Sequence, residues 1–260
     1  MLEIIILGSG TSHGVPMIGC DCAVCRSNDP RNKRTRPSIA VRGPAGTILV
    51  DTPPELRLQA IACNLRAVDA VLFTHTHADH LMGLDDLRRY NDLMGKEIPI
   101  YGDASTLEDI RRVFRYVFIE TQAGGGKPRL QLFEVKSPME LCGLTIEAFY
   151  VLHGNLPVLA YRFYDPQTQR SVAYVTDVSH IPPEAMEKLY HLDLLIIDAV
   201  RYEPHPTHFG LWQTLEVIEQ LQPKQALLTH LSHRFDHATL CAETPEHVNP
   251  AYDGQVICLE

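Results

Sequence analysis

Short apolar runs rich in β-branched residues recur along the chain, and turn residues or amphipathic segments follow most of them. Runs of this length and composition predict β-strands. We expect strands at residues 3–7, 38–42, 47–51, 70–74, 130–135, 144–152, 158–164, 171–176, 194–197, 225–229 and 255–259.

Segments with helical spacing of apolar residues lie between these strands and predict helices at residues 54–64, 81–90, 183–190 and 208–221. Ser105 and Glu108 have capping-box spacing and predict the start of a further helix that runs to about residue 117. Thr207 is the expected N-cap of the 208–221 helix. The glycine-rich stretch 122–128 predicts an exposed loop.

The order of these elements has two similar halves, in which hairpin-like strands precede strands that alternate with helices. Two such halves suggest two sheets packed face to face with helices outside, an arrangement of the α/β (α+β) class. No stretch divides the chain like a linker, so we expect a single domain over residues 1–260.

Composition and charge argue against some classes of function. The chain has 260 residues, of which 45% are hydrophobic and 21% charged, and its formal net charge is −9. A clamp for nucleic acid of any sequence needs a basic face, so this balance argues against one. The negative net charge does not exclude an anionic substrate, because bound divalent metals would make the charge at the site positive. The N-terminus lacks a basic leader, and no apolar run could span a bilayer, so we expect a cytoplasmic protein without a membrane partner.

The seven cysteines are an odd number, which fits a disulfide framework poorly and suits a reducing compartment. Cys20, Cys22 and Cys25 lie within six residues of one another, and this crowding indicates metal ligation. We expect the others to be small buried hydrophobic residues: Cys63, Cys142, Cys241 and Cys258.

The segment His75-Thr76-His77-Ala78-Asp79-His80 directly follows the predicted strand 70–74. In an extended chain His75 and His77 project to the same side and could grip one cation. Asp79 and His80 lie where the chain turns into a helix, which suits a second cation nearby. Imidazole and carboxylate ligands are typical of Zn, Mn or Fe sites.

Two cations need more ligands, and three candidates share one placement just after a predicted strand. His153 follows strand 144–152, Asp177 follows strand 171–176, and His230 follows strand 225–229. The ends of several strands often converge on one rim, and the two oxygens of Asp177 could bridge two metals. Any one of these residues alone would more often be structural.

This order of residues resembles the metallo-β-lactamase superfamily across nearly the whole chain. The resemblance implies a four-layer αβ/βα sandwich, with two β-sheets flanked by helices. It implies one metal held by His75, His77, His153 and Asp177, and a second held by Asp79, His80, Asp177 and His230. An aspartate at position 177 is similar to the phosphodiesterase and thioesterase branches, whereas true β-lactamases often carry a cysteine there.

Two features indicate which branch of the superfamily the chain resembles. The glycine-rich stretch 7–16 after the first strand is a weak phosphate-loop signal or a plain turn, and it resembles the opening of the tRNase Z and PhnP branches. A closed zinc site needs four ligands. Cys20, Cys22 and Cys25 would supply three of them, and His233 in the segment 229–233 could supply the fourth. This set resembles PhnP, which implies a structural zinc knuckle at residues 19–26 that fastens an N-terminal loop to the C-terminal part. A reduced, unliganded turn is the alternative.

His208 lies at the expected start of a helix, and its position resembles the active-site histidine of PhnP and tRNase Z. The resemblance implies a role in phosphate binding and leaving-group protonation, while a surface histidine at a helix end is the alternative. His205 and His13 are weaker candidates for substrate contacts. Asp51 and Asp198 each end a strand and could orient ligand histidines or cap a loop.

The expected function is therefore hydrolysis of small phosphodiesters, such as cyclic ribose or nucleotide phosphates, to phosphomonoesters. A hydroxide activated by two divalent metals, Mn or Zn or else Fe or Ni, would attack phosphorus, with His208 and Asp79 as catalytic residues. The resemblance also implies a homodimer. The alternatives are a tRNA 3′-processing endonuclease, for which we find no substrate-gripping arm, a thioesterase similar to glyoxalase II, and an accessory protein similar to PqqB.

Overall fold

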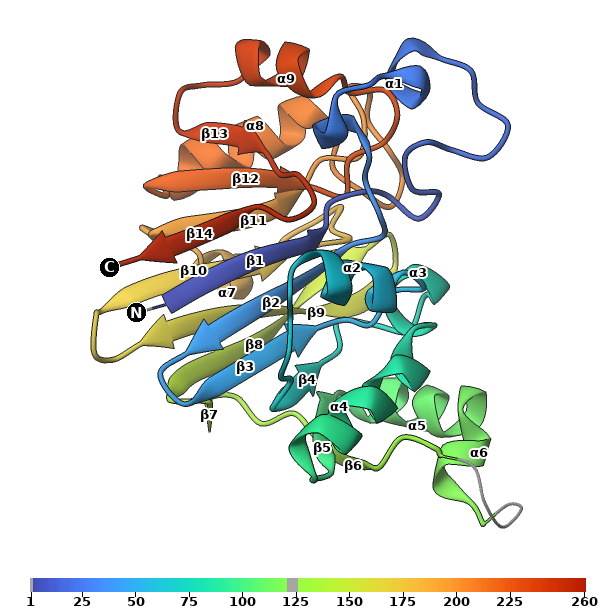
Figure 1. The fold of residues 1–260 in the computed structure, drawn as a ribbon. Coiled ribbons are helices and arrows are strands. Elements are labelled where there is room, and N and C mark those ends of the chain that lie inside the picture. The colour runs from blue at the N-terminus through green and yellow to red at the C-terminus, as the bar shows by residue number, and fades with distance from the viewer. Residues whose placement is uncertain (1, 121–125) are drawn as a thin grey trace.

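The computed structural model describes residues 2–120 and 126–260, and two β-sheets form its centre (Figure 1). Within these residues the strand order is β14-β1-β2-β3-β4-β5-β6 in the first sheet and β13-β12-β11-β10-β9-β8-β7 in the second. The strands are β1 (Leu2–Gly8), β2 (Ser38–Gly43), β3 (Gly46–Val50), β4 (Ala70–Leu72), β5 (Ile98–Gly102), β6 (Leu130–Glu134), β7 (Met139–Leu141), β8 (Leu144–His153), β9 (Leu156–Asp165), β10 (Arg170–Val175), β11 (Leu194–Asp198), β12 (Gln225–Thr229), β13 (Val248–Pro250) and β14 (Val256–Leu259).

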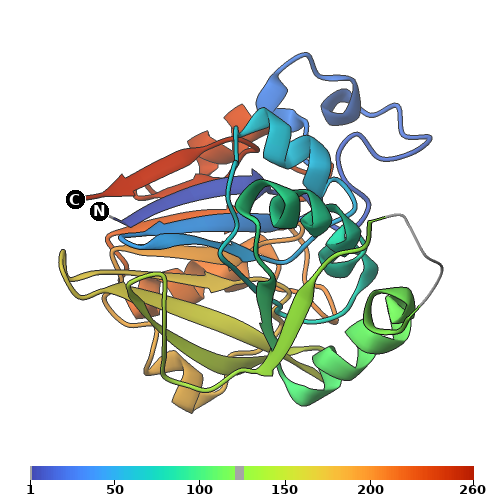
Figure 2. The ribbon, with the colours of Figure 1, turned by 60° about the horizontal axis from the view of Figure 1, so that its bottom comes forward.

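Helices cover the outer face of each sheet, so that the molecule has four layers (Figure 2). They are α1 (Ala23–Arg26), α2 (Leu56–Ala62), α3 (Ala78–Leu81), α4 (Leu87–Met94), α5 (Ala104–Val113), α6 (Arg115–Phe118), α7 (Pro183–Met186), α8 (Leu211–Leu221) and α9 (His237–Glu243), with 3₁₀ turns η1 (Pro30–Asn32) and η2 (Leu84–Asp86). None of the helices among the described residues has the length and apolar character needed to cross a membrane.

The apolar run of β1 shows why the sheets take this place. Ile4 and Ile6 belong to the core between the two sheets, whereas Ile5 and Leu7 belong to the core between the first sheet and its helices. Successive side chains of a strand point to opposite faces, and a strand covered on both faces needs apolar residues at every position. The four-layer αβ/βα sandwich expected from the sequence is therefore confirmed.

The parallel strands of the two sheets decide where functional residues gather. β3, β4, β5 and β6 run parallel in the first sheet, as do β10, β11, β12 and β13 in the second. In open sheets with parallel strands, ligands bind beyond the carboxyl ends of the strands. The segments that follow β4, β10 and β12 carry His75, Asp177 and His230, as the sequence predicted.

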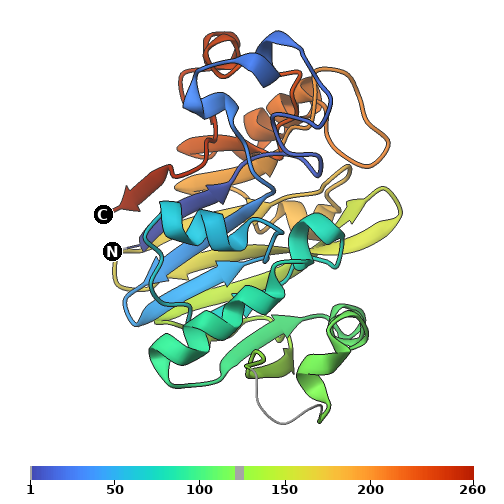
Figure 3. The same ribbon diagram turned by 45° about the vertical axis from the view of Figure 1, so that its right-hand side comes forward.

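The two ends of the chain meet in the first sheet. β14 pairs antiparallel with β1, with Leu2 opposite Leu259 (Figure 1). The segment that follows β1 then runs toward the C-terminal helix α9 (Figure 3), and Asn32 Nδ2 there donates to Asp236 Oδ2 over 2.7 Å. N-terminal and C-terminal residues can therefore contribute to one site.

Four helix predictions were wrong in detail, and one of them is the helix expected at residues 183–190, which ends at Met186. The expected helix 81–90 is divided into α3, η2 and α4, because Gly83 packs against the preceding loop: its N–H donates to Thr52 O (2.8 Å), and a Cβ there would lie 2.0 Å from Pro53 O. The residue that caps α5 is Asp103, whose side chain accepts from Thr106 N, so Ser105 lies inside the helix.

The helix expected at 208–221 begins at Leu211, and its N-cap is Gly210, not Thr207. Two backbone hydrogen bonds hold Phe209 outside the helix: its N–H donates to Val178 O (2.6 Å), and its carbonyl accepts from Val200 N (3.1 Å). His208 therefore lies on an extended segment before the helix.

Other expectations have mixed outcomes. Residues 122–125 of the expected loop lie outside the described residues. β5, β7, β13, α1 and α9 were not predicted. The prediction that the four scattered cysteines are buried was wrong, since three are half-buried and Cys258 is exposed. Among the described residues, all seven cysteines are free of disulfides.

Candidate metal centre

Two groups of four side chains meet at the carboxyl ends of the strands and share Asp177. His75, His77, His153 and Asp177 form the first group, and Asp79, His80, Asp177 and His230 form the second. In each group the ligand atoms all lie within 4.8 Å of one another. These are the two ligand sets that the family resemblance implies.

Asp177 lies between the groups and presents a different oxygen to each. Its Oδ2 is 3.8 Å from His75 Nε2 and 3.9 Å from His153 Nε2, in the first group. Its Oδ1 is 3.1 Å from His80 Nε2 and 3.5 Å from His230 Nε2, in the second. A carboxylate in this position can bridge two cations.

The nitrogen atoms of this centre fit bound cations. Among the described residues, Nε2 of His75, of His80 and of His230 is buried and lacks a hydrogen-bond partner. Buried polar atoms are almost always satisfied, so three such nitrogens facing the same carboxylate indicate ligands for positive ions. Oxygen and imidazole donors are typical of Zn, Mn and Fe sites.

Electrostatics keep His75, Asp79 and Asp177 in forms that can bind a cation, whereas neighbouring carboxylates outweigh burial and raise the pKa of His80 and of His230, so a metal has to displace a proton from each of these two rings. Burial lowers the pKa of His75 well below its usual value, so its ring is neutral and offers a lone pair. Burial alone would raise the pKa of Asp177, but His230 and His80 hold it well below its usual value. His80 and His230 likewise outweigh burial and lower the pKa of Asp79.

Asp51 orients two of the ligand histidines. Its Oδ2 accepts from His80 Nδ1 (2.7 Å) and from Thr74 Oγ1 (2.8 Å), and its Oδ1 accepts from Thr74 N (2.8 Å). Because Thr74 Oγ1 donates to Asp51, it is left to accept from His75 Nδ1 (3.0 Å). Both rings therefore carry hydrogen on Nδ1 and present Nε2 to the centre, the arrangement that metal-bound imidazoles usually need.

A backbone carbonyl does the same for His153, whose Nδ1 donates to Thr207 O over 2.6 Å. Neither Thr74 nor Thr207 was expected to take part in the site. Thr74 sits between a buried strand and a ligand histidine, which is the one local signal that could have pointed to it. No local signal marks the carbonyl of Thr207, because it reaches His153 across 54 residues.

His208 lies beside both ligand groups. Its ring centroid is 4.5 Å from that of His153 and 4.6 Å from that of His230. Its Nδ1 donates to Asp198 Oδ2 over 2.6 Å, and the other oxygen of Asp198 lies 3.9 Å from His230 Nδ1. Asp198 thus fixes the orientation of the His208 ring through Nδ1.

The two weaker candidates differ in position. His205 is half-buried, and its ring centroid is 5.2 Å from that of His208, at the edge of the centre. His13 is exposed, and in the part of the chain that the structure describes it makes neither a hydrogen bond nor a ring contact. The structure therefore places His205 beside His208, and among the described residues neither His205 nor His13 belongs to a ligand group.

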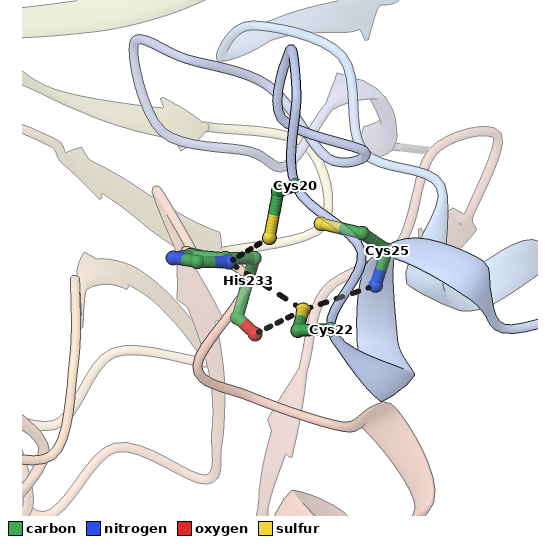
Figure 4. A group of neighbouring side chains, drawn as sticks. All are labelled: Cys20, Cys22, Cys25 and His233. Carbon is green, nitrogen blue, oxygen red and sulfur yellow. Dashed lines mark hydrogen bonds between the residues drawn. The ribbon is translucent and has the colours of Figure 1, made fainter.

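A second cluster lies apart from this centre and joins distant parts of the chain (Figure 4). Cys20 Sγ is 3.2 Å and Cys22 Sγ is 3.5 Å from His233 Nδ1, and Cys25 Sγ belongs to the same group. Three sulfurs and one imidazole are the donors of a closed structural zinc site, so these residues fit a zinc ion. The N–H of Cys25 donates to Cys22 Sγ and is the largest cause that lowers the pKa of Cys22 to about 6, which favours the ligating thiolate.

Comparison with known proteins agrees with the fold. A family model described as a beta-lactamase superfamily domain matches residues 46–231. The chain therefore belongs to the metallo-β-lactamase superfamily and is a hydrolase of that fold, which confirms the resemblance seen in the sequence. Within the superfamily it is similar to a diphosphatase from the PhnP family, with 37% identity, a TM-score of 0.91, and coverage of 100% of this chain and 98% of that one.

Two further relatives are similar in sequence. An octanoyltransferase from Porphyromonas gingivalis is 40% identical over 261 residues, which are 97% of this chain and 51% of that protein. The chain thus spans about half the length of this relative. Coenzyme PQQ synthesis protein B from Rhodopseudomonas palustris is 27% identical over 230 residues, covering 76% of this chain and 73% of that protein.

Proposed function

We propose that the protein is a metal-dependent phosphodiesterase that hydrolyses small phosphodiesters, of which cyclic ribose and nucleotide phosphates are the first candidates. The observation that carries the proposal is the position of His208 next to two ligand groups that share Asp177. Two cations held there would neutralise phosphoryl oxygens and lower the pKa of an attacking water.

Besides the two cations, hydrolysis of a phosphodiester needs a proton donor for the leaving alkoxide, and His208 can fill this role. Because its Nδ1 donates to Asp198, its Nε2 remains to contact a phosphoryl oxygen or to give a proton to the leaving alkoxide. His208 is almost fully buried, so water competes weakly for this nitrogen. Asp79 stays ionised as a ligand, since neighbouring histidines hold its pKa low.

The similarity to a PhnP-family diphosphatase along the full chain also supports phosphoryl chemistry. That protein is described as a diphosphatase, so a diphosphate linkage belongs in the substrate panel beside carbon esters of phosphate. The acidic net charge of −9 does not favour a long nucleic acid, which would have to lie across surface outside the metal centre.

Thioester hydrolysis is the second candidate. The name of the Porphyromonas gingivalis relative concerns the transfer of an octanoyl group, and the aspartate at position 177 resembles the thioesterase branch as well as the phosphodiesterase branch. An octanoyl thioester is therefore the appropriate competing substrate.

The deciding experiment is a substrate screen with protein that has been stripped of metal and reconstituted with Mn or Zn. The panel contains bis-p-nitrophenyl phosphate, a five-membered cyclic ribose phosphate, a dinucleoside diphosphate, precursor tRNA and an octanoyl thioester. We expect cleavage of the phosphodiesters, lost in the Asp177→Ala variant and kept in a Cys258→Ser control. Turnover of the thioester alone, or of precursor tRNA alone, would refute the proposal, and metal binding without turnover of any substrate would indicate an accessory protein.

A further inference from the structure

One short segment serves both metal-binding clusters. It follows β12 and carries His230, a member of the second ligand group, and His233, a member of the cysteine cluster. The two residues are separated by Leu231 and Ser232 only. Whatever fixes the backbone between them fixes His230 as well.

The segment after β1 holds this backbone. Leu231 N donates to Ser9 O over 2.9 Å, and Leu231 O accepts from Thr11 N over 3.2 Å. Gly10 forms a parallel bridge with Leu231, and a Cβ at Gly10 would lie 2.8 Å from Arg34 O, so glycine is needed for the close approach. The residue that directly follows His230 is thus bound at both of its peptide groups.

Arg34, further along the same N-terminal segment, also holds residues 231–235. Its side chain is only 1% exposed, and its Nη1 donates to Ser232 O (3.1 Å) and Phe235 O (2.9 Å). Its Nη2 donates to Asn32 Oδ1 (3.1 Å). The N-terminal segment that supplies these contacts also carries Cys20, Cys22 and Cys25 (Figure 4).

His230 needs such support because its backbone is strained. Its φ is +59°, in the left-handed region that residues other than glycine rarely adopt. A residue held there costs about 1–3 kcal/mol and persists only where its surroundings determine the conformation. The contacts of Leu231 and Ser232 are those surroundings.

We propose that the cysteine cluster, through the zinc that its donors fit, holds the N-terminal segment against residues 231–233 and thereby positions His230 for the second ligand group. Cys20, Cys22, Cys25 and His233 are then positioning residues, acting on the metal centre through the backbone. The inference rests on the metal centre of the proposed function but not on its substrate, so it can fail while phosphodiester hydrolysis stands.

The test measures metal affinity rather than turnover. Full-length wild type and the Cys22→Ser variant are stripped, reconstituted and titrated with Zn against a chromogenic chelator, with stoichiometry checked by elemental analysis. We expect the variant to lose one equivalent of zinc outright and to bind one further equivalent about 10–100-fold more weakly, the size that loss of a supporting residue typically has. Cys241→Ser, a half-buried cysteine outside both clusters, is the matched control and should behave as wild type.

A double-mutant cycle shows whether the effect passes through His230. In a His230→Ala background, Cys22→Ser should cause no further loss of affinity at the metal centre, because the residue it positions is absent. Additive losses in the double variant, or unchanged affinity at the metal centre in Cys22→Ser itself, would overturn the proposal. If Cys22→Ser fails to fold, His233→Cys and His233→Ala replace it: the first keeps four zinc donors and should preserve the affinity, and the second should lower it.

Discussion

Replacing Asp51 with asparagine separates the orientation of the ligand histidines from the stability of the fold. Asp51 is fully buried, and its two oxygens serve three donors: Thr74 N, Thr74 Oγ1 and His80 Nδ1. An asparagine has nearly the same shape but offers one oxygen and one NH₂ group. The amide group can therefore take two orientations, and these differ in which hydrogen bonds of the neighbours are kept.

In the first orientation the amide oxygen accepts from Thr74 N, and the NH₂ group faces His80 and Thr74 Oγ1. The NH₂ then donates to His80 Nδ1, which moves the ring hydrogen to Nε2 and prevents that nitrogen from binding a metal. In the second orientation the amide oxygen faces His80 and preserves Nε2 for a metal, but the NH₂ group opposes Thr74 N–H and both donors are unsatisfied. The metal-free variant should adopt the first orientation, and a metal must force the second.

The cost of metal binding in this variant is the cost of that change. Each buried donor without an acceptor costs about 1–3 kcal/mol, so the two donors cost about 2–6 kcal/mol, which at about 1.4 kcal/mol per factor of ten is roughly a 30-fold to 20,000-fold loss of affinity. The stability of the metal-free protein should change little, since the first orientation leaves each donor paired. Zn titration against a chelator measures the affinity, urea unfolding measures the stability, and ¹⁵N NMR of the imidazoles identifies the tautomer of His80.

Asp165→Asn is the matched control for this experiment. Asp165 is also fully buried and accepts from Gln167 N (2.9 Å) and Thr168 Oγ1 (2.9 Å), but it is the last residue of β9, before the turn to β10. It should lower stability without changing metal affinity. Wild-type metal affinity in Asp51→Asn, or a loss of affinity no larger than its loss of stability explains, would refute the orientation argument.

Three further predictions concern other residues. His208→Ala should lower kcat about 10²–10⁴-fold and leave metal content intact by elemental analysis, because His208 lies outside both ligand groups; wild-type turnover would remove it from the mechanism. Asp177→Ala should lose metal by the same analysis, and full retention would contradict its bridging position. Burial, then Arg31 and Arg34, lower the pKa of His237 from 6.5 to about 4, so the unfolded chain binds this proton more readily and the free energy of unfolding should fall between about pH 6.5 and 4. Urea unfolding across that range should give a flatter profile for His237→Gln, and an unchanged profile would show that another group is responsible.

The sequence predicted which residues come together at the candidate metal centre, because these residues follow strands. His153, Asp177 and His230 are far apart in the chain, yet each comes at the end of an apolar run. The carboxyl ends of parallel strands meet at one edge, so placement after a strand carries three-dimensional information. The prediction thus needed only the period of the apolar pattern and the direction of the chain.

Other features depend on contacts that no local pattern contains. β5 escaped prediction because Pro99 argues against an internal strand, although β5 lies between β4 and β6 in the sheet. The break at Gly83 arises from its approach to the backbone of residues 52 and 53, which belong to another element. In both places the packing of distant segments outweighed the local preference.

The backbone conformation at the metal centre is a further place where the surrounding structure outweighs local preference, at a cost in free energy. Asp51, Asp177 and His230 have φ values of +63°, +56° and +59°, and each lies one or two residues after the end of a strand. At about 1–3 kcal/mol for each residue, three left-handed positions are a large part of the 5–15 kcal/mol by which domains are usually stable. Left-handed backbone turns the chain sharply away from the strand direction, so Asp177 and His230 can face a common point while Asp51 reaches His80. A chain selected for stability alone would place glycine at such positions, and a carboxylate or imidazole at all three therefore indicates that the ligand geometry is what this edge of the fold maintains.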